Sequence, residues 1–439
     1  MRSDLGELTP SMSVPIPGSR SRELVDVLAA TECPSLTGRR KRRSEASGAA
    51  QDPIVWTQAC GANVVDADGN VLVDMTAGFG AASIGHAHPS VVRAIREQSE
   101  RLIHALGDVH PSDVKIELCE RLAKLAPFPD ARVMLGAHGG DAIEAALKTA
   151  MLATGRAGVL AFEGSYHGLA HAPLAISGYA ERFRAPFASQ LNPHVVFEAY
   201  GASMDVIDAH FADGSIGCVV VEPILGRGGV VVPKDGWLAS LARTARARRV
   251  LFIVDEIMTG LGRTGARFAF EREGVVPDVL CLGKALGGGL PMSACIASHD
   301  VMKAWGTPDQ ESIHTATFFG HPLACAASLA ALDAIEEEGL AERAASVGAD
   351  LATRLATLAS SQACVREIRG RGLLLGVAMR RPASALRVGA ALLERGFITL
   401  AAGSDASVLS LTPPLSIAPA QNDAFVDALE VVLGEESAT

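Results

Sequence analysis

The sequence contains no closely paired cysteines. Its eight cysteines are scattered, and no two of them form a C-x-x-C motif. Such pairs hold zinc or exchange disulfides, so their absence argues against both roles. Cys218 and Cys281 lie inside apolar segments that are typical of strands. We therefore expect the cysteines to be reduced core residues that neither form disulfides nor bind a metal.

Positive charge and long apolar runs are also scarce. The net charge of −10 argues against nucleic acid as a partner. No run approaches the roughly 18 apolar residues that a membrane-spanning helix needs, and the N-terminus does not resemble a signal peptide. We therefore expect a cytoplasmic protein without a membrane partner. The one basic run, residues 39–43, is expected to be a solvated part of an N-terminal arm.

Lysine is infrequent, with only seven among the 39 basic residues, and one lysine stands in an unusual place. Lys284 follows the apolar run Val279–Leu282 and precedes three consecutive glycines at 287–289. A lysine that serves solubility lies on a polar face, whereas this pattern indicates a buried parallel strand that carries the amine to the carboxyl edge of a sheet. At that edge Lys284 is a candidate nucleophile toward carbonyl groups.

Asp255 ends a second apolar run, which starts at Val250. The same reasoning puts its carboxylate at the same edge of the sheet as Lys284. Pyridoxal phosphate needs this combination, because a lysine binds its aldehyde and a carboxylate keeps its ring nitrogen protonated. A neighbouring opposite charge shifts a pKa by about 1–3 units, which is enough for that purpose.

Several separated segments resemble the signature of class III pyridoxal-phosphate aminotransferases, which have fold type I. They are residues 254–265, 277–278 and 282–291, and the likeness runs from about Trp56 to about Ile417. The resemblance implies an α/β fold in which a large domain, with a mainly parallel seven-stranded sheet flanked by helices, precedes a smaller α+β C-terminal domain. It also implies that Lys284 and Asp255 are catalytic and bind the cofactor.

Apolar strands alternate with amphipathic helices between residues 132 and 325. Five strands are expected, at Val159–Phe162, Val195–Phe197, Cys218–Glu222, Val250–Asp255 and Val279–Leu282. This alternation by itself predicts a mainly parallel sheet with helices on both faces.

A chain of 439 residues exceeds one ordinary core, so more than one domain is expected. Residues 1–50, rich in Ser, Pro and Arg, predict a partly ordered arm that crosses onto a partner subunit. Residues 51–90 form the first part of the small domain, with a hairpin at Asn63–Asp74 around an Asp-Gly turn. Residues 91–325 form the large cofactor-binding domain. Residues 326–439 form the C-terminal small domain, with a strand at Leu373–Met379 and a final helix near Asp423–Leu433.

Gly139 and Gly140 open a helix that is expected to run to about Gly155. Glycines let backbone amides approach a ligand, and a helix N-terminus attracts anions. Asp141 and Glu144 complete a capping pattern. The alternative is an ordinary capped helix, but the resemblance favours a phosphate site, although relatives usually carry Ser or Thr where Gly140 stands.

Four further residues are expected on the cofactor side. The motif at Tyr166-His167-Gly168 resembles one that places an aromatic ring on the cofactor, so Tyr166 is expected to stack there; His167 has either a structural or a supporting role. Glu222 ends a strand and is expected to support the polar groups of the cofactor, unless it forms a plain salt bridge. Thr317 matches a threonine that binds the phosphate from the neighbouring subunit in relatives, which implies a homodimer with shared active sites.

The substrate side departs from the pattern of the family. Many relatives carry a glutamate where this chain has Arg227 and an arginine where it has Ser410, and that arginine grips the substrate α-carboxylate. Its loss would remove roughly 1.5–3 kcal/mol of carboxylate binding. Arg227 either replaces it from the opposite wall or pairs with a surface carboxylate. Phe79 matches a loop residue on the substrate side.

These features predict a pyridoxal-phosphate-dependent aminotransferase that moves an amino group between a primary amine or amino acid, of the ω-amine type, and an oxo acid. One alternative is an amino-acid racemase, epimerase or aminomutase on the same fold. A second alternative, from another class, is a catalytically silent ligand-binding homologue. Retention of Lys284, Asp255 and Glu222 argues against the latter.

Overall fold

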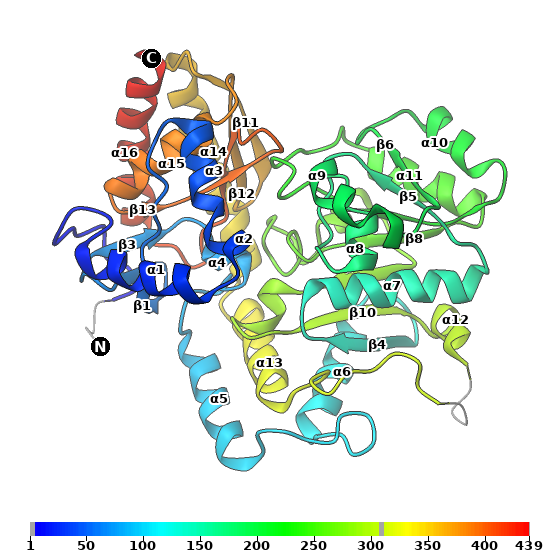
Figure 1. The fold of residues 1–439 in the computed structure, drawn as a ribbon. Coiled ribbons are helices and arrows are strands. Elements are labelled where there is room, and N and C mark those ends of the chain that lie inside the picture. Colours follow the sequence, from blue (N-terminus) through cyan, green and yellow to red (C-terminus); the bar gives the residue numbers. More distant parts are fainter. Residues whose placement is uncertain (1–4, 307–310, 439) are drawn as a thin grey trace.

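The computed structural model describes residues 5–306 and 311–438, which form two lobes that lie side by side (Figure 1). The large lobe is built on a seven-stranded sheet, and the small lobe contains two four-stranded sheets. The predicted α/β fold with a large, mainly parallel sheet and a smaller C-terminal unit is confirmed.

The large sheet has the strand order β4-β10-β9-β8-β7-β5-β6. Strands β5 to β9 are parallel to their neighbours, whereas β10 is antiparallel to both β4 and β9. The bounds are β4 Ala131–Gly136, β5 Gly158–Phe162, β6 Val195–Glu198, β7 Ile216–Val221, β8 Leu251–Asp255, β9 Val279–Leu282 and β10 Ser293–Ser298. The five predicted strands are present with small shifts at their ends. Strands β4 and β10 were not predicted.

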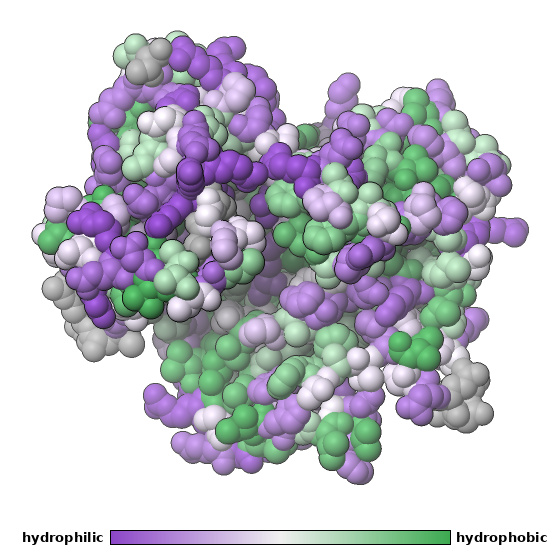
Figure 2. Space-filling model, in the orientation of Figure 1, coloured by the Kyte–Doolittle hydropathy of each residue, from purple (hydrophilic) through white to green (hydrophobic). Residues whose placement is uncertain are grey.

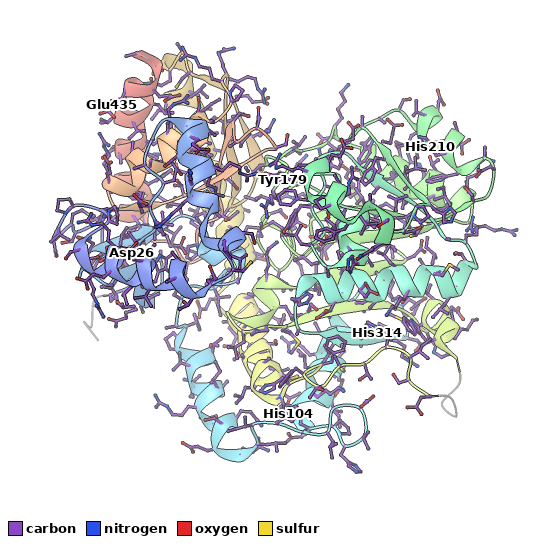
Figure 3. All side chains as sticks on the ribbon, viewed as in Figure 1. Asp26, His104, Tyr179, His210, His314 and Glu435 are labelled. Carbon is purple, nitrogen blue, oxygen red and sulfur yellow. The ribbon has the colours of Figure 1, made fainter. Side chains whose placement is uncertain are left out.

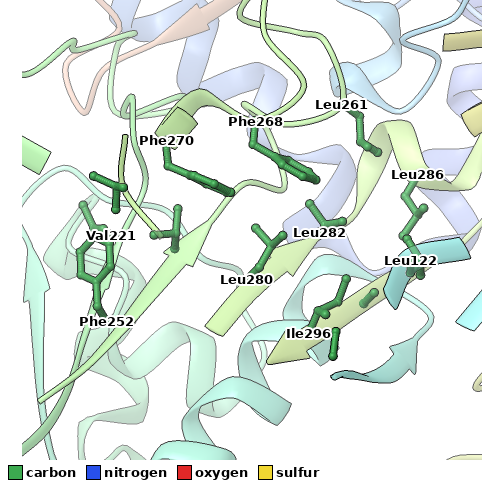
Figure 4. Close-up of a cluster of buried hydrophobic side chains, with 14 of the residues drawn as sticks. Leu122, Val221, Phe252, Leu261, Phe268, Phe270, Leu280, Leu282, Leu286 and Ile296 are labelled. Atoms are coloured by element: carbon green, nitrogen blue, oxygen red, sulfur yellow. The ribbon is translucent and has the colours of Figure 1, made fainter. Parts of the chain in front are cut away.

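Helices cover both faces of this sheet, so its inner strands are buried on both faces, whereas the edge strands β4 and β6 are partly buried. In β7, Val219 and Val221 pack with Phe252 in one cluster, shown in Figure 4, whereas Cys218 and Val220 face the opposite cluster. The first cluster is covered by α6 Asp113–Leu125, α10 Met204–Phe211, α11 Trp237–Ala247 and α13 Pro322–Glu337. The second is covered by α7 Gly139–Thr154. The predicted helices on both faces are therefore present.

The small lobe joins segments from both ends of the chain. Its antiparallel sheet has the order β11-β12-β15-β14, formed by Val365–Arg371, Leu374–Met379, Val408–Leu411 and Leu400–Ala402. The second sheet, β1-β2-β3-β13, is formed by Trp56–Cys60, Asn63–Asp66, Val71–Asp74 and Phe397–Ile398. Helices α14 Leu340–Ser361, α15 Ser384–Glu394 and α16 Pro419–Ala438 complete this lobe. The predicted hairpin corresponds to β2 and β3, with Gly69 at a φ of 87° in its turn.

The N-terminal segment is more regular than the sequence predicted. It forms α1 Ser19–Thr31, α2 Pro34–Thr37 and α3 Arg39–Ser47, and the last of these carries the basic run. Asp68 in the hairpin turn accepts hydrogen bonds from the backbone amides of Arg20 and Ser21, at 2.8 and 2.9 Å. The segment therefore begins a helix on the small lobe of its own chain.

Shorter elements complete the two lobes. They are α4 Ala77–Gly80, α5 Pro89–Arg101, α8 His171–Ala175, α9 Glu181–Arg184 and α12 His299–Met302, with 3₁₀ segments at Ala185–Gln190, Ala269–Glu273, Lys284–Gly287 and Lys303–Trp305. None of the helices within residues 5–306 and 311–438 combines the length and apolar character that crossing a membrane requires.

All eight cysteines carry free thiols. Cys218, Cys281, Cys295 and Cys325 are buried, as expected, but Cys33 is exposed. The prediction that all the cysteines are core residues is therefore wrong for Cys33, which stands just before the short helix α2 rather than in an apolar strand.

Candidate active site

Three parallel strands bring their polar end residues to one edge of the large sheet. Asp255 is the last residue of β8, Glu222 follows β7, and Lys284 stands two residues after β9. Because β7, β8 and β9 are neighbours and run parallel, their carboxyl ends meet at the same edge. The structure thus brings together the lysine and the two carboxylates that the sequence selected.

Lys284 lies in a half-buried position with a left-handed φ of 44° at the start of a 3₁₀ turn. Burial lowers the pKa of the Lys284 amine, whereas the negative charges of Asp255 and Glu222 oppose that change. Gly80 lies beside the same side chain, since a Cβ there would be in van der Waals contact with Lys284 Cδ, at 3.5 Å. The amine is therefore less protonated than an ordinary lysine and is enclosed by its own chain.

Asp255 is held by a buried hydrogen-bonded pair with His167. His167 Nδ1 lies 2.7 Å from Asp255 Oδ2, and the Ile257 amide donates to Oδ1 at 3.0 Å. Burial by itself would lower the pKa of His167, but the hydrogen bond and charge of Asp255 outweigh it, and the charge of Glu222 adds to them, so the pKa is raised. Of the two roles left open for His167, the contacts favour support of Asp255.

Glu222 braces two backbone segments. Its carboxylate accepts hydrogen bonds from the amide of Tyr166 at 2.8 Å and from the amide of Gly226 at 3.0 Å. Burial raises the pKa of Glu222, although these amides and the nearby His167 counteract that effect. No basic side chain in the part of the chain that the structure describes forms a salt bridge with Glu222, so the alternative of a plain salt bridge finds no support.

The start of α7 forms a narrow cradle. A Cβ on Gly139 would lie 2.9 Å from Ile257 Cδ1, and a Cβ on Gly140 would lie 3.0 Å from His138 Nδ1. Asp141 Oδ2 accepts hydrogen bonds from the amides of Ala137 and His138 at 2.8 and 3.0 Å. Asp141 therefore caps the helix.

Glu144 does not take part in this cap. Its carboxylate lies 3.3 Å from the Lys148 amine one turn further along α7, on the surface of the helix. The predicted capping pair is therefore wrong for Glu144. The cap instead uses Asp141 at the third helical position, which leaves the first two amides of α7 without a partner within the helix.

The donor set at this edge fits pyridoxal phosphate, the cofactor that the sequence predicts. Buried His167 Nε2 has no hydrogen-bond partner among the described residues, so the pair with Asp255 retains polar capacity. The amine of Lys284 suits an aldehyde, the carboxylate of Asp255 suits a ring nitrogen, and the amides at Gly139 and Gly140 suit a phosphate. Within the described ranges, no group of three potential metal ligands occurs.

The loop that carries Phe79 has a strained backbone. Ala77, Gly78, Phe79 and Gly80 all have positive φ values, between 46° and 79°. Asp74 holds this loop, since its carboxylate accepts hydrogen bonds from the amides of Thr76 and Gly78 and also lies 2.9 Å from His86 Nε2. Phe79 itself is 56% exposed.

Ser410 lies at the centre of β15, opposite Gly376 of β12 and Leu400 of β14. Leu409 and Leu411 belong to the core of the small lobe, so the alternation of the strand turns Ser410 to the opposite face.

Arg227 lies half-buried among aromatic rings. Its guanidinium carbon is 4.4 Å from the ring centroid of Tyr166, 5.0 Å from that of Tyr179 and 5.8 Å from that of Phe183. No carboxylate of the described residues forms an ion pair with Arg227. The alternative in which Arg227 pairs with a surface carboxylate therefore finds no support.

Thr317 is set apart from the other predicted residues. It is exposed on the segment before α13, in a depression that it shares with His104 and Lys115, and no hydrogen bond joins it to Gly139 or Gly140 in the described part of the chain. Within a single chain, the structure does not bring Thr317 into the cradle.

Sequence reasoning missed three contributors to this region. Asp74 and His86 hold the Phe79 loop, and Tyr179 packs against Arg227. The chain has only three tyrosines, and this scarcity was a signal that could have drawn attention to Tyr179. Asp74 follows an apolar strand in the same way as Asp255, so that pattern was a signal as well.

Three comparisons relate the chain to known proteins. The family model "Aminotransferase class-III" matches residues 45–433. The chain is 37% identical to the acetylornithine aminotransferase of Methanothermobacter thermautotrophicus over 388 residues, which cover 88% of this chain and 95% of that protein.

Two solved structures share the fold. An ornithine aminotransferase from Toxoplasma gondii, whose description reports partial occupancy of PLP at its active site, superposes with a TM-score of 0.82 and 31% identity, over 95% of this chain and 99% of that one. An (S)-enantioselective ω-transaminase from Thermomicrobium roseum superposes with a TM-score of 0.84 and 28% identity, over 95% and 99% of the two chains.

Proposed function

The chain belongs to the class-III aminotransferase family, and on that premise we propose that it moves an amino group between a primary amine or amino acid and an oxo acid, with pyridoxal phosphate bound at Lys284. The predictions of the family and of an aminotransferase are confirmed. The proposal rests on one observation: Lys284 and the Asp255–His167 pair lie at the same edge of the sheet.

Pyridoxal phosphate, when bound, supplies an aldehyde that accepts an amino group and a ring that accepts electrons. Lys284 Nζ would hold the aldehyde, and Asp255 would hold a proton on the ring nitrogen. The amides of Gly139 and Gly140 would bind the phosphate, helped by the positive end of α7. Tyr166, whose backbone is fixed by Glu222, would pack against the ring.

Lys284 would have a second role, toward the substrate. Its Nζ takes the proton from the substrate carbon that bears the amino group, as a general base. A base must be unprotonated to act, and burial favours the neutral amine by lowering its pKa. Asp255 and Glu222 limit that decrease, so the amine can still retain a proton after it has acted.

The active sites are completed by a second copy of the chain. Thr317 would reach the phosphate of the partner, as the family resemblance implies. In support, Thr317 lies among exposed apolar side chains: Leu102, Ile103, Leu106, Val109, Ile313 and Phe318, each between 39% and 66% exposed. Figure 2 shows hydrophobic side chains gathered in the lower part of the molecule, where α5 lies in Figure 1. Apolar surface of this kind marks a protein interface.

The substrate amine is proposed to be of the ω type, at the end of the molecule remote from other polar groups. Two observations support this class. One relative acts on acetylornithine by its name, and one structural neighbour is an ω-transaminase. In addition, Phe79 precedes Gly80, which lies close to Lys284, and its exposed ring offers an apolar surface that suits the carbon chain of such a substrate.

Two measurements test this function. Borohydride treatment of the holoenzyme followed by peptide mapping is expected to find the cofactor on Lys284; an unmodified Lys284 peptide would remove the basis of the proposal. An amine donor supplied without an oxo acid is expected to bleach the absorption band of the bound aldehyde. A racemase would keep that band, and a silent homologue would bind no coloured cofactor.

A further inference from the structure

Arg227 is held between rings that are themselves fixed. The Tyr179 hydroxyl donates a hydrogen bond to the Gly403 carbonyl at 2.9 Å, and Tyr179 lies where the two lobes face each other (Figure 3). The backbone of Tyr166 is anchored on Glu222. Aromatic faces attract a guanidinium and orient it, so the position of Arg227 is defined by both lobes.

Aromatic rings surround the guanidinium of Arg227, but they do not occupy its hydrogen-bond donors. An arginine has five N–H donors, all in the plane of the group. Among the described residues, none accepts a hydrogen bond from the Arg227 side chain, and none forms an ion pair with it. A half-buried guanidinium with unoccupied donors can bind an anion. Its planar donors match a ligand with two oxygens in one plane, which is the geometry of a carboxylate.

Met258 links this arginine to Lys284. A Cβ on Gly226, next to Arg227, would lie 3.0 Å from Met258 Cγ. A Cβ on Gly80 would lie 3.3 Å from Met258 Sδ and 3.5 Å from Lys284 Cδ. The backbone next to Arg227 and the loop beside Lys284 therefore both approach Met258, and the positive charge of Arg227 is close enough to contribute to the lowered pKa of Lys284.

We propose that Arg227 binds the carboxylate of the substrate, and that the enzyme therefore selects amino donors and oxo acceptors that carry a carboxylate away from the reacting carbon. The inference rests on the proposed aminotransferase function. Donor and acceptor occupy the same pocket in turn, so one cation serves both. Ser410 has a neutral hydroxyl and cannot supply that charge.

The first test compares two donors that differ in one group. The holoenzyme and its Arg227→Gln variant are assayed with 4-aminobutyrate and with butylamine, in which a methyl replaces the carboxylate. The variant is expected to lose kcat/KM for 4-aminobutyrate by about 10-fold to 100-fold, mainly through KM, because a charge-assisted pair is lost. The kcat/KM for butylamine is expected to change by less than about 2-fold, because butylamine has no carboxylate to pair with Arg227.

The second test does not depend on turnover. Glutarate has two carboxylates but no amine or carbonyl, so it binds without reacting, and its Kd is measured by calorimetry on the holoenzyme. Arg227→Gln is expected to raise the Kd for glutarate by about 10-fold or more. Arg227→Lys keeps the charge but not the planar fork, so an intermediate loss is expected.

Arg184→Gln is the matched control. Arg184 also stacks on an aromatic ring, that of Phe197 at 4.0 Å, but Phe197 lies on β6 at the far edge of the sheet. Arg184→Gln is expected to have the wild-type kcat/KM for both donors and the wild-type Kd for glutarate. If Arg227→Gln does not fold, Arg227→Lys decides the question by the same comparison.

Two outcomes would overturn the assignment: equal losses with both donors, or unchanged glutarate binding in the Arg227 variants. Failure of the proposed function gives a different pattern, in which the wild type transfers no amino group from either donor. Glutarate binding would then still report on Arg227 by itself.

Discussion

Replacement of His167 by phenylalanine tests how the carboxylate of Asp255 is held in place. The substitution keeps a ring of similar size and removes the 2.7 Å contact between His167 Nδ1 and Asp255 Oδ2. Asp255 is 4% exposed and would retain only the amide of Ile257 as a partner. Removing one member of a buried pair leaves an uncompensated charge, which costs about 3–5 kcal/mol.

A second variant separates charge from hydrogen bonding. His167→Gln retains an N–H donor for Asp255 but cannot become positive. A hydrogen bond to a charged group contributes about 1.5–3 kcal/mol, so the glutamine variant is expected to lose clearly less stability than the phenylalanine variant. Urea unfolding of the cofactor-free protein and titration with pyridoxal phosphate measure both consequences. A phenylalanine variant with the stability and cofactor affinity of the wild type would refute the role assigned to His167.

The pair also predicts how stability depends on pH. The pKa of His167 is raised in the folded protein, so the folded state binds its proton more tightly than the unfolded chain. The resulting stabilisation is fully present below the ordinary histidine pKa of about 6.5 and is lost as the pH rises through the raised value. His167→Phe is expected to lack this dependence, and unfolding measured across that pH range checks it.

Three further outcomes are expected. Lys284→Ala is expected to abolish turnover while circular dichroism remains that of the wild type; substantial activity would exclude Lys284 from the mechanism. Gly139→Ala places a Cβ within 2.9 Å of Ile257 Cδ1, so it is expected to lower the free energy of unfolding by about 1–3 kcal/mol and to weaken cofactor binding. The control Gly434→Ala meets open space in α16, so it is expected to leave stability unchanged or slightly higher in the same assays. Mixing Lys284→Ala with Thr317→Ala subunits is expected to restore activity in the mixed dimers, because one of their two sites then has both residues; no recovery would argue against shared sites.

The meeting of Lys284 and Asp255 at one edge of the sheet was predictable because it depends on local patterns. Lys284 and Asp255 each follow a strand buried on both faces, and such strands are visible as apolar runs. Strand β10 was not predicted because it consists mostly of small residues, such as Ser293, Ala294 and Ala297. It forms a strand because it pairs with β4 and β9. The helices before residue 50 escaped because their sequence has weak periodicity, and contacts with the hairpin turn help to fix them.

Other parts of the site depend on positions that no local pattern encodes. The rings around Arg227 come from residues 166, 179 and 183, and only the folded chain brings them to residue 227. Thr317 remains a prediction, because its proposed partner belongs to a second subunit.

The pairing of β3 with β13 sets the order in which the molecule can be completed. Val73 lies beside Phe397, so the first sheet of the small lobe needs a strand from near the other end of the chain. During synthesis at about 5–20 residues per second, β3 would wait on the order of tens of seconds for that strand. The large sheet, whose strands all lie between residues 131 and 298, can assemble meanwhile. The apolar residues of the early hairpin are thus exposed to chaperones and to wrong partners until β13 has been synthesised.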